Sequence, residues 1–260
     1  MSIIFFDVDG TIMGRDGYIP ASAGQAIRQL RKNGHYCLLN TGRPFIDLEP
    51  ELINIGFDGF VCTCGQHVLF QNKLLFHDGF DPKTSQLLYD LGLRCHMDMY
   101  FESEQGVWVE QSHPLTPELQ MSLDRFARRG IVVDSPSNCR CFQFDKFSIS
   151  YTEGSLLPEF LNQVQTYCEV IRREGTMYEL PKRGNSKGTG AAIISRHTGI
   201  PLEMCFAVGD STNDISMLSC VGHPIVMGSA PRSVQSLAEY VTDLLENDGI
   251  AHAMEYFGLI

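Results

Sequence analysis

The segment from Ile3 to Thr11 constrains the fold more than any other part of the chain. Four apolar residues without alternation run directly into Asp-Val-Asp-Gly-Thr. A short continuous apolar run is typical of a strand buried on both faces, as in a parallel sheet. The carboxyl ends of such strands are where open α/β sheets present ligand-binding groups. We therefore expect Asp7 and Asp9 at the mouth of a sheet, with Gly10 allowing a sharp turn after them.

The spacing of Asp7 and Asp9 favours a functional role over a structural one. A single aspartate after a strand would fit a helix N-cap or a turn. Two carboxylates this close repel one another unless a cation or a proton lies between them. The pair therefore predicts a site in which one of these balances the charge.

The rest of the chain alternates between strand-like and helical segments. A helical period over 21–32 precedes an apolar run at 36–39, and a helix is predicted over 44–55. Further short apolar runs follow at 60–63, 205–208, 224–227 and 240–242. Strands that alternate with helices indicate a parallel sheet with right-handed crossovers. The expected fold class is α/β, with a doubly wound parallel sheet.

Polar residues recur where predicted strands end and helices begin. Thr41 and Gly42 follow the second strand, and Lys187 lies before a helix that includes 191–194. The segment Gly-Asp-Ser-Thr-Asn-Asp at 209–214 follows the strand at 205–208. A hydroxyl and amides at a helix start favour an anion, although each segment alone would also fit an ordinary capped turn or a solvated charge. Arg43 fits a surface charge, a buried pair or a substrate contact equally well.

These segments resemble, in order, the four motifs of the haloacid dehalogenase (HAD) superfamily. The first is Asp7 to Thr11, the second Thr41-Gly42-Arg43, the third Lys187, and the fourth 209–214. The resemblance covers the whole chain and is to the Cof-like branch, which implies a Rossmann-like catalytic core at 1–80 and 184–260. Cof-like members usually carry Asn-Gly-Ala where this chain has Cys64-Gly65-Gln66. The chain departs from the family pattern at both flanking positions, and Cys64 replaces an amide that would hydrogen-bond near the substrate.

The intervening segment 81–183 has a different pattern, which predicts an inserted α+β domain. Its expected order is α, ββ, α, β, α, ββ, with helices on one face of an antiparallel sheet. The predicted helices are 84–91, 117–129 and 156–167, and the predicted strands are 96–102, 107–110, 141–151, 169–171 and 176–180. This order resembles the type IIB cap of Cof-like phosphatases.

The resemblance implies a Mg²⁺-dependent phosphatase that hydrolyses a small phosphorylated metabolite, and the expected metabolite is a sugar phosphate. Asp7 would attack phosphorus and form an aspartyl phosphate. Asp9 would protonate the leaving alcohol and then activate water, which requires a carboxyl group kept protonated under a closed cap. The expected metal ligands are the Asp7 carboxylate, the Asp9 carbonyl and Asp210, with Asp214 orienting the metal's waters or Lys187. The expected phosphoryl contacts are Thr41, Gly42, Lys187 and Asn213.

Composition limits the other partners of the chain. A net charge of −11 argues against nucleic acid and anionic membranes. Nine cysteines, several inside apolar runs, and a strand predicted from residue 3 favour reduced thiols in a cytoplasmic protein without a signal peptide. Two rival functions remain, a phosphomutase of the same superfamily and a non-enzymatic phospho-accepting signalling domain. The oligomeric state is not indicated.

Overall fold

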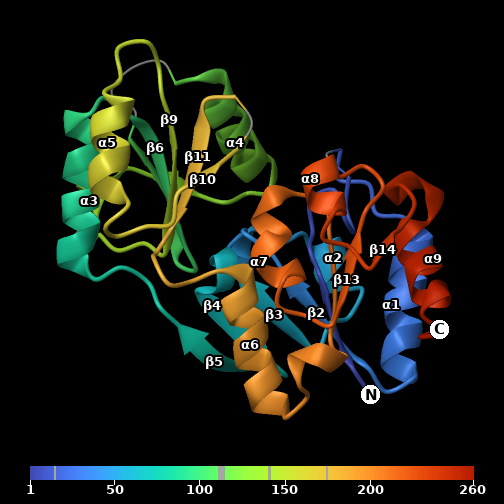
Figure 1. Cartoon of the computed structure of the whole chain (residues 1–260). Coiled ribbons are helices and arrows are strands. Elements are labelled where there is room, and N and C mark those ends of the chain that lie inside the picture. Colours follow the sequence, from blue (N-terminus) through green and yellow to red (C-terminus); the bar gives the residue numbers. More distant parts are fainter. Residues whose placement is uncertain (15, 111–114, 140–141, 174) are drawn as a thin grey trace. The chain divides into compact units, whose positions relative to one another are not determined.

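The computed structural model describes residues 1–260 except 15, 111–114, 140–141 and 174. The chain divides into two compact units (Figure 1). The first comprises 1–43, 48–77 and 186–260, and the second comprises 44–47 and 78–185. The sequence did not indicate that 44–47 groups with the second unit, and the expected core and cap limits remain a proposal. None of the described helices is long and apolar enough to span a membrane.

The first unit is built on an eight-stranded sheet with the order β14-β13-β12-β1-β2-β3-β4-β5. Strands β14 to β3 pair in parallel, whereas β3, β4 and β5 pair antiparallel. The strands are β1 Ile3–Phe6, β2 Tyr36–Asn40, β3 Gly59–Cys62, β4 His67–Phe70, β5 Lys73–His77, β12 Phe206–Gly209, β13 His223–Val226 and β14 Tyr240–Val241. The expected α/β fold with a parallel sheet is confirmed.

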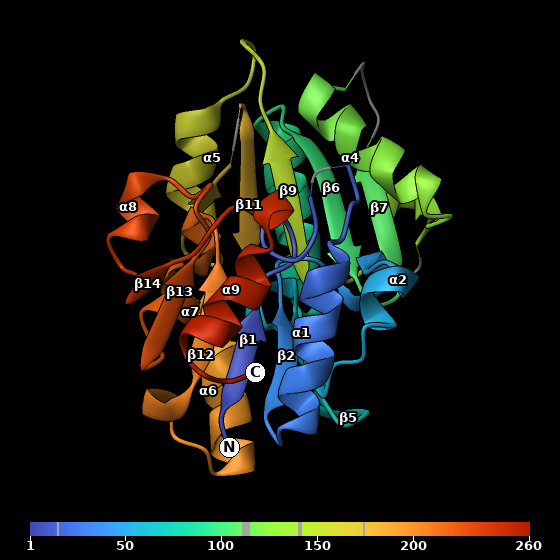
Figure 2. The ribbon, with the colours of Figure 1, turned by 90° about the vertical axis from the view of Figure 1, so that its right-hand side faces the viewer.

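Helices cover both faces of this sheet, as Figure 2 shows for α1 and α9 in front of it. The helices are α1 Ala21–Lys32, α2 Pro50–Ile53, α6 Lys187–Thr198, α7 Ile215–Leu218, α8 Arg232–Gln235 and α9 Gly249–Tyr256. Apolar residues of α6, α7 and α8 form one buried cluster with Ile3 and Phe5 of β1. Because β1 is covered on both faces, all four of its residues are completely buried.

Strand β1 lies at the centre of the sheet, between β12 and β2, and this placement brings the polar strand ends together. Phe6 is in register with Val208 of β12 and with Leu39 of β2. The Asp7 amide continues the ladder by donating to the Val208 carbonyl at 2.9 Å. Asp7 therefore leaves β1 at the same sheet edge at which β12 leads to Asp210 and β2 leads to Thr41.

The second unit contains a six-stranded sheet with the order β10-β11-β9-β6-β7-β8. All pairs are antiparallel except β7 and β8. The strands are β6 Asp98–Ser103, β7 Gly106–Glu110, β8 Val133–Asp134, β9 Lys146–Ser150, β10 Ile171–Arg172 and β11 Met177–Pro181. The helices are α3 Pro82–Arg94, α4 Pro117–Arg128 and α5 Leu157–Val164. The predicted strand at 141–151 is shorter here, and its first residue lies outside the described part of the chain.

The helices of the second unit pack on both faces of its sheet, so the expectation of one covered face is wrong. Residues of α3 and α5 form a buried cluster with Met99 and Phe101 of β6. Residues of α4 form a separate cluster with Tyr100 of β6 and Val107 of β7. Because successive side chains of a strand point to opposite faces, α4 covers the face opposite to α3 and α5.

The single helix predicted over 44–55 is also wrong. The segment forms a 3₁₀ turn at Phe45–Asp47 and the short helix α2, separated by extended backbone. Glu49 has φ −64° and ψ 137°, because a following proline, here Pro50, disfavours the helical conformation of the residue before it. The break leaves Asp47 completely buried, where Arg125 and Arg129 of the same unit pair with it at 3.1 and 2.9 Å.

Candidate active site

Four of the predicted side chains meet in one cluster in the first unit, and all but the partly buried Asp210 are buried. The Lys187 ammonium lies 2.5 Å from Oδ1 of Asp7 and 2.6 Å from Oδ1 of Asp214. Carboxylate oxygens of Asp7, Asp210 and Asp214 all lie within 4.8 Å of one another. The cluster therefore joins the segments after β1 and β12 with the first residue of α6.

Local structure fixes Lys187 at the start of α6. Ser186 is the N-cap, and its hydroxyl and that of Thr189 form a reciprocal capping box with the opposite backbone amides. The buried Asn40 at the end of β2 donates from Nδ2 to the Lys187 carbonyl at 2.9 Å. The Lys187 side chain is only 1% exposed, so its charge is held in place rather than solvated. Sequence reasoning missed Asn40, although a polar residue ending an apolar strand was a usable signal.

Asp214 connects the fourth motif to Lys187. Its Oδ2 accepts hydrogen bonds from the Asp210 and Ser211 amides, both at 3.0 Å, while Oδ1 faces the ammonium. Of the two roles expected for Asp214, the contact with Lys187 is therefore present. Asn213 makes a different contact, in which its Oδ1 accepts from the Ser211 hydroxyl at 2.6 Å.

The donor set fits a divalent cation. Among these four side chains, three carboxylates face one ammonium, which leaves an excess of negative charge. Oxygen donors of this kind are the ligands that Mg²⁺ prefers. Gly10 has φ +81°, and a Cβ there would overlap Oδ2 of Asp210, so only glycine lets the first motif approach this carboxylate. The backbone is therefore shaped to bring Asp210 up to the strand end that carries Asp7.

Electrostatics of the cluster favour a cation near Asp7. Burial and then the charge of Asp214 raise the pKa of Asp7 well above its usual range, although Lys187 acts in the opposite direction. Burial alone would lower the pKa of Lys187, but the charges of Asp214 and Asp7 outweigh it, and the pKa is raised. Lys187 thus stays protonated, and its charge offsets only part of the effect that burial and the neighbouring carboxylates have on the pKa of Asp7.

The Asp9 carboxylate is directed to a different partner. Arg43 donates from Nε to Oδ2 of Asp9 at 2.8 Å and from Nη2 to Oδ1. Its Nη1 also donates to both oxygens of Glu49, at 3.0 and 3.1 Å. The Arg43 side chain is 9% exposed and that of Asp9 is 47% exposed. Of the three alternatives for Arg43, the structure therefore contains the pair, in which the guanidinium is buried and the Asp9 carboxylate is about half exposed.

Thr41 and Gly42 are buried beside the turn that follows β3. Oγ1 of Thr41 accepts from the Arg43 amide at 3.2 Å, and the Thr41 carbonyl accepts from the Cys64 amide at 3.1 Å. Cys64 is 3% exposed. Its backbone, rather than its side chain, makes this contact, so the replacement of the family's asparagine leaves the link to Thr41 in place.

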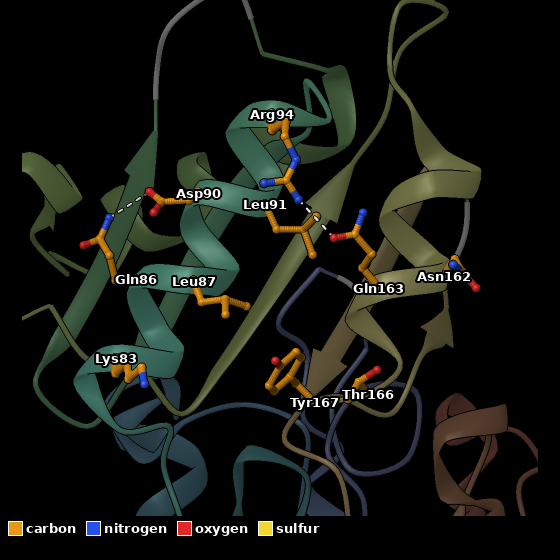
Figure 3. A pocket seen from close by; sticks show the side chains of 10 residues that line it. All are labelled: Lys83, Gln86, Leu87, Asp90, Leu91, Arg94, Asn162, Gln163, Thr166 and Tyr167. Carbon is orange, nitrogen blue, oxygen red and sulfur yellow. Dashed lines mark hydrogen bonds between the residues drawn. The ribbon is translucent and has the colours of Figure 1, made fainter.

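A separate groove of about 820 Å³ lies between α3 and α5 of the second unit (Figure 3). Arg94 of α3 donates to Oε1 of Gln163 of α5 at 3.0 Å across it, and Gln86 donates to Asp90 along one rim. None of the residues predicted to act in catalysis lines this groove. It does not gather carboxylates around an ammonium as the cluster at Lys187 does.

Comparison with known proteins agrees with the order of the motifs. The family model for haloacid dehalogenase-like hydrolases matches residues 4–254. A putative phosphatase of Bacillus subtilis, YkrA, is 25% identical over 99% of this chain and 98% of its own. An HMP-PP phosphatase of Yersinia enterocolitica is 25% identical over 97% of this chain and 93% of its own.

Solved structures agree as well. A HAD subclass IIB sugar phosphatase superposes with a TM-score of 0.84 over the full length of both chains, at 25% identity. A haloacid dehalogenase-like hydrolase from B. subtilis gives 0.83 at 22% identity, covering 98% of this chain and 99% of its own, which supports the fold alone. From these matches and the motif residues in the cluster, the chain belongs to the haloacid dehalogenase-like hydrolases and is a Cof-like phosphatase.

Proposed function

We propose that this phosphatase requires Mg²⁺ and hydrolyses a sugar phosphate through an aspartyl phosphate on Asp7. The observation that carries the proposal is the buried contact of Lys187 with Asp7 and Asp214, with Asp210 in the same cluster. A carboxylate attacks an anionic phosphate ester only when nearby positive charge offsets their repulsion. Asp7, the carbonyl of Asp9 and Asp210 would hold Mg²⁺, which supplies part of that charge.

In the first half-reaction, a carboxylate oxygen of Asp7 forms a bond to phosphorus while the bond from phosphorus to the ester oxygen breaks. Asp9 gives a proton to the departing alcohol. Thr41, Gly42, Lys187 and Asn213 hold the oxygens of the phosphoryl group during the transfer. Asp9 is paired with Arg43, and this step requires that Asp9 carries a proton.

In the second half-reaction, water attacks the phosphorus of the aspartyl phosphate and the bond to Asp7 breaks. Asp9, which has given up its proton in the first half-reaction, accepts the proton of the water. Inorganic phosphate leaves and Asp7 is regenerated. We assign the choice of substrate to the proposed cap at 81–183, because a domain that closes over a site excludes water and selects the leaving group.

The substrate class is proposed from the relatives. One neighbour is a sugar phosphatase of subclass IIB, and other relatives are phosphatases of 5-amino-6-(5-phospho-D-ribitylamino)uracil and of HMP-PP. These share a small phosphorylated metabolite as substrate. A panel of phosphorylated sugars and cofactors, with p-nitrophenyl phosphate as a general substrate, would be incubated with the protein in MgCl₂ or in EDTA. We expect phosphate release from sugar phosphates in MgCl₂ and little in EDTA.

Two variants test the roles of the aspartates. Asp7→Asn should abolish turnover while leaving the fold intact, and retained activity would refute the nucleophile. Asp9→Asn should abolish p-nitrophenyl phosphate turnover, whereas a signalling domain would carry a long-lived aspartyl phosphate and have no use for Asp9. A phosphomutase would return the phosphoryl group to the sugar, so phosphate release without an added sugar bisphosphate excludes it.

A further inference from the structure

The turn between β3 and β4 has an unusual backbone. Thr63, Cys64 and Gly65 have φ values of 52°, 55° and 89°, so three successive residues adopt the left-handed region. Residues other than glycine rarely enter this region, and they do so where the surroundings hold them there. A connection between two antiparallel strands does not in itself require three such residues. The contacts of the turn with its surroundings therefore explain this conformation.

The first contact is with the segment that carries Thr41. The Thr63 amide donates to the Arg43 carbonyl at 2.9 Å, and the Cys64 amide donates to the Thr41 carbonyl at 3.1 Å. The left-handed conformation points these two amides at neighbouring carbonyls of the second motif. The turn therefore fixes the backbone on both sides of Gly42.

The second contact is with the start of α6. A Cβ on Gly65 would overlap the backbone carbonyl of Ser186, the N-cap residue, and would lie 3.3 Å from the Gly190 amide nitrogen. A Cβ on Gly190 would in turn lie 3.2 Å from Cα of Gly65. Two glycines thus face one another, and the helix that begins with Lys187 packs directly against the turn.

We propose that the turn Thr63–Gly65 is a positioning element for the phosphoryl-transfer site, with Gly65 as its principal positioning residue. It sets the location of Lys187 relative to Thr41, because one rigid turn contacts both segments. The hydrogen bond from Asn40 of β2 to the Lys187 carbonyl holds the start of α6 in the same position. The inference rests on the proposed function, since it concerns the residues proposed to hold phosphate.

The test compares Gly65→Ala with Gly34→Ala. Gly34 has φ +88°, nearly the same as Gly65, but a Cβ there would meet nothing within 4 Å. Both variants carry the backbone strain, whereas Gly65→Ala alone displaces the start of α6. We expect kcat for p-nitrophenyl phosphate to fall by roughly 10- to 100-fold in Gly65→Ala, the size that a misplacement of about 1 Å produces. In Gly34→Ala it should stay within about twofold, by the same reasoning.

A second measurement separates this inference from the proposed function. Binding of inorganic phosphate in MgCl₂, measured by calorimetry below the melting transition, should weaken in Gly65→Ala and not in Gly34→Ala. If the parent protein turns over no ester, the proposed function fails and phosphate binding still tests the turn. If it is active but Gly65→Ala matches Gly34→Ala in kcat and phosphate affinity, the inference is overturned.

Asn40→Leu keeps the test decisive if Gly65→Ala does not fold. It removes the hydrogen bond to the Lys187 carbonyl with a side chain of similar size. We expect a fall in kcat and in phosphate affinity in the folded variant. If folded Asn40→Leu keeps the parent kcat and phosphate affinity, the proposal that contacts with the start of α6 position Lys187 is contradicted.

Discussion

The ammonium of Lys187 contacts Asp214 at 2.6 Å, and this side chain of Asp214 is completely buried. The same carboxylate accepts two backbone hydrogen bonds from the fourth motif. Lys187 and Asp214 come from segments 27 residues apart in the chain. The pair therefore ties the start of α6 to the segment that carries Asp210, and the ammonium also reaches Asp7.

Removing the ammonium should therefore affect both folding and turnover. Lys187→Met leaves the buried carboxylates of Asp7 and Asp214 without this cation, and breaking a buried pair in this way costs about 3–5 kcal/mol. Urea unfolding would measure the loss in free energy, and phosphate release would measure the loss of turnover. Lys182→Met is the control, because Lys182 pairs with Asp78 at a partly exposed position and should cost less than about 1 kcal/mol. If Lys187→Met and Lys182→Met lose the same free energy of unfolding, the buried contact of Lys187 with Asp7 and Asp214 is contradicted.

Divalent metal should stabilise the native protein through the same cluster. A ligand that binds only the folded state at a hundred times its Kd adds about 2.7 kcal/mol. We expect the melting temperature to rise when MgCl₂ is added and to return to its starting value when EDTA removes the metal. Asp210→Ala should lose this response and raise the Mg²⁺ concentration needed for turnover, because it removes one of the clustered carboxylates. An unchanged metal titration in Asp210→Ala would show that the ion binds elsewhere.

The stability of the first unit should depend on pH through His35. Partial burial, with the nearby N-terminal charge, lowers the pKa of His35 below its usual value. Because the folded state binds this proton less well than the unfolded state, the contribution of His35 is present above the unfolded pKa and is lost as pH falls through the folded pKa. We expect the melting temperature of His35→Gln to fall less than that of the parent protein between pH 7.5 and pH 5.

The sequence predicted the strand ends that carry the site because the signals there are local. The apolar run of β1 followed by Asp7, and that of β12 followed by Asp210, each occupy a few consecutive residues. Their adjacency follows from the parallel fold, in which carboxyl ends of strands share one edge. The sequence left two roles open for Asp214, the orientation of the metal's waters or of Lys187, because it does not show which group this side chain reaches.

Features that depend on packing were not predictable in the same way. Tyr100 alternates with Met99 and Phe101 in β6, and the sequence does not say which helix covers which face. The run Val107-Trp108-Val109 in β7 was a signal that both faces are covered, because it lacks polar alternation. The partner of Arg43 was left open, since a long side chain reaches residues far apart in sequence. Only the fold brings Asp9 and Glu49 to its two sides.

The pair of Arg43 with Asp9 should matter for turnover. Arg43→Lys keeps the charge but loses the fork that contacts Asp9 through Nε and Nη2. We expect kcat for p-nitrophenyl phosphate to fall by about tenfold or more, because misplaced catalytic groups lose rate steeply with distance. Arg31→Lys is a control, since Arg31 makes a similar forked contact outside the site, from Nε to Oδ2 and from Nη2 to Oδ1 of Asp58. If both variants keep the parent rate, the orientation of Asp9 by Arg43 plays no part in the reaction.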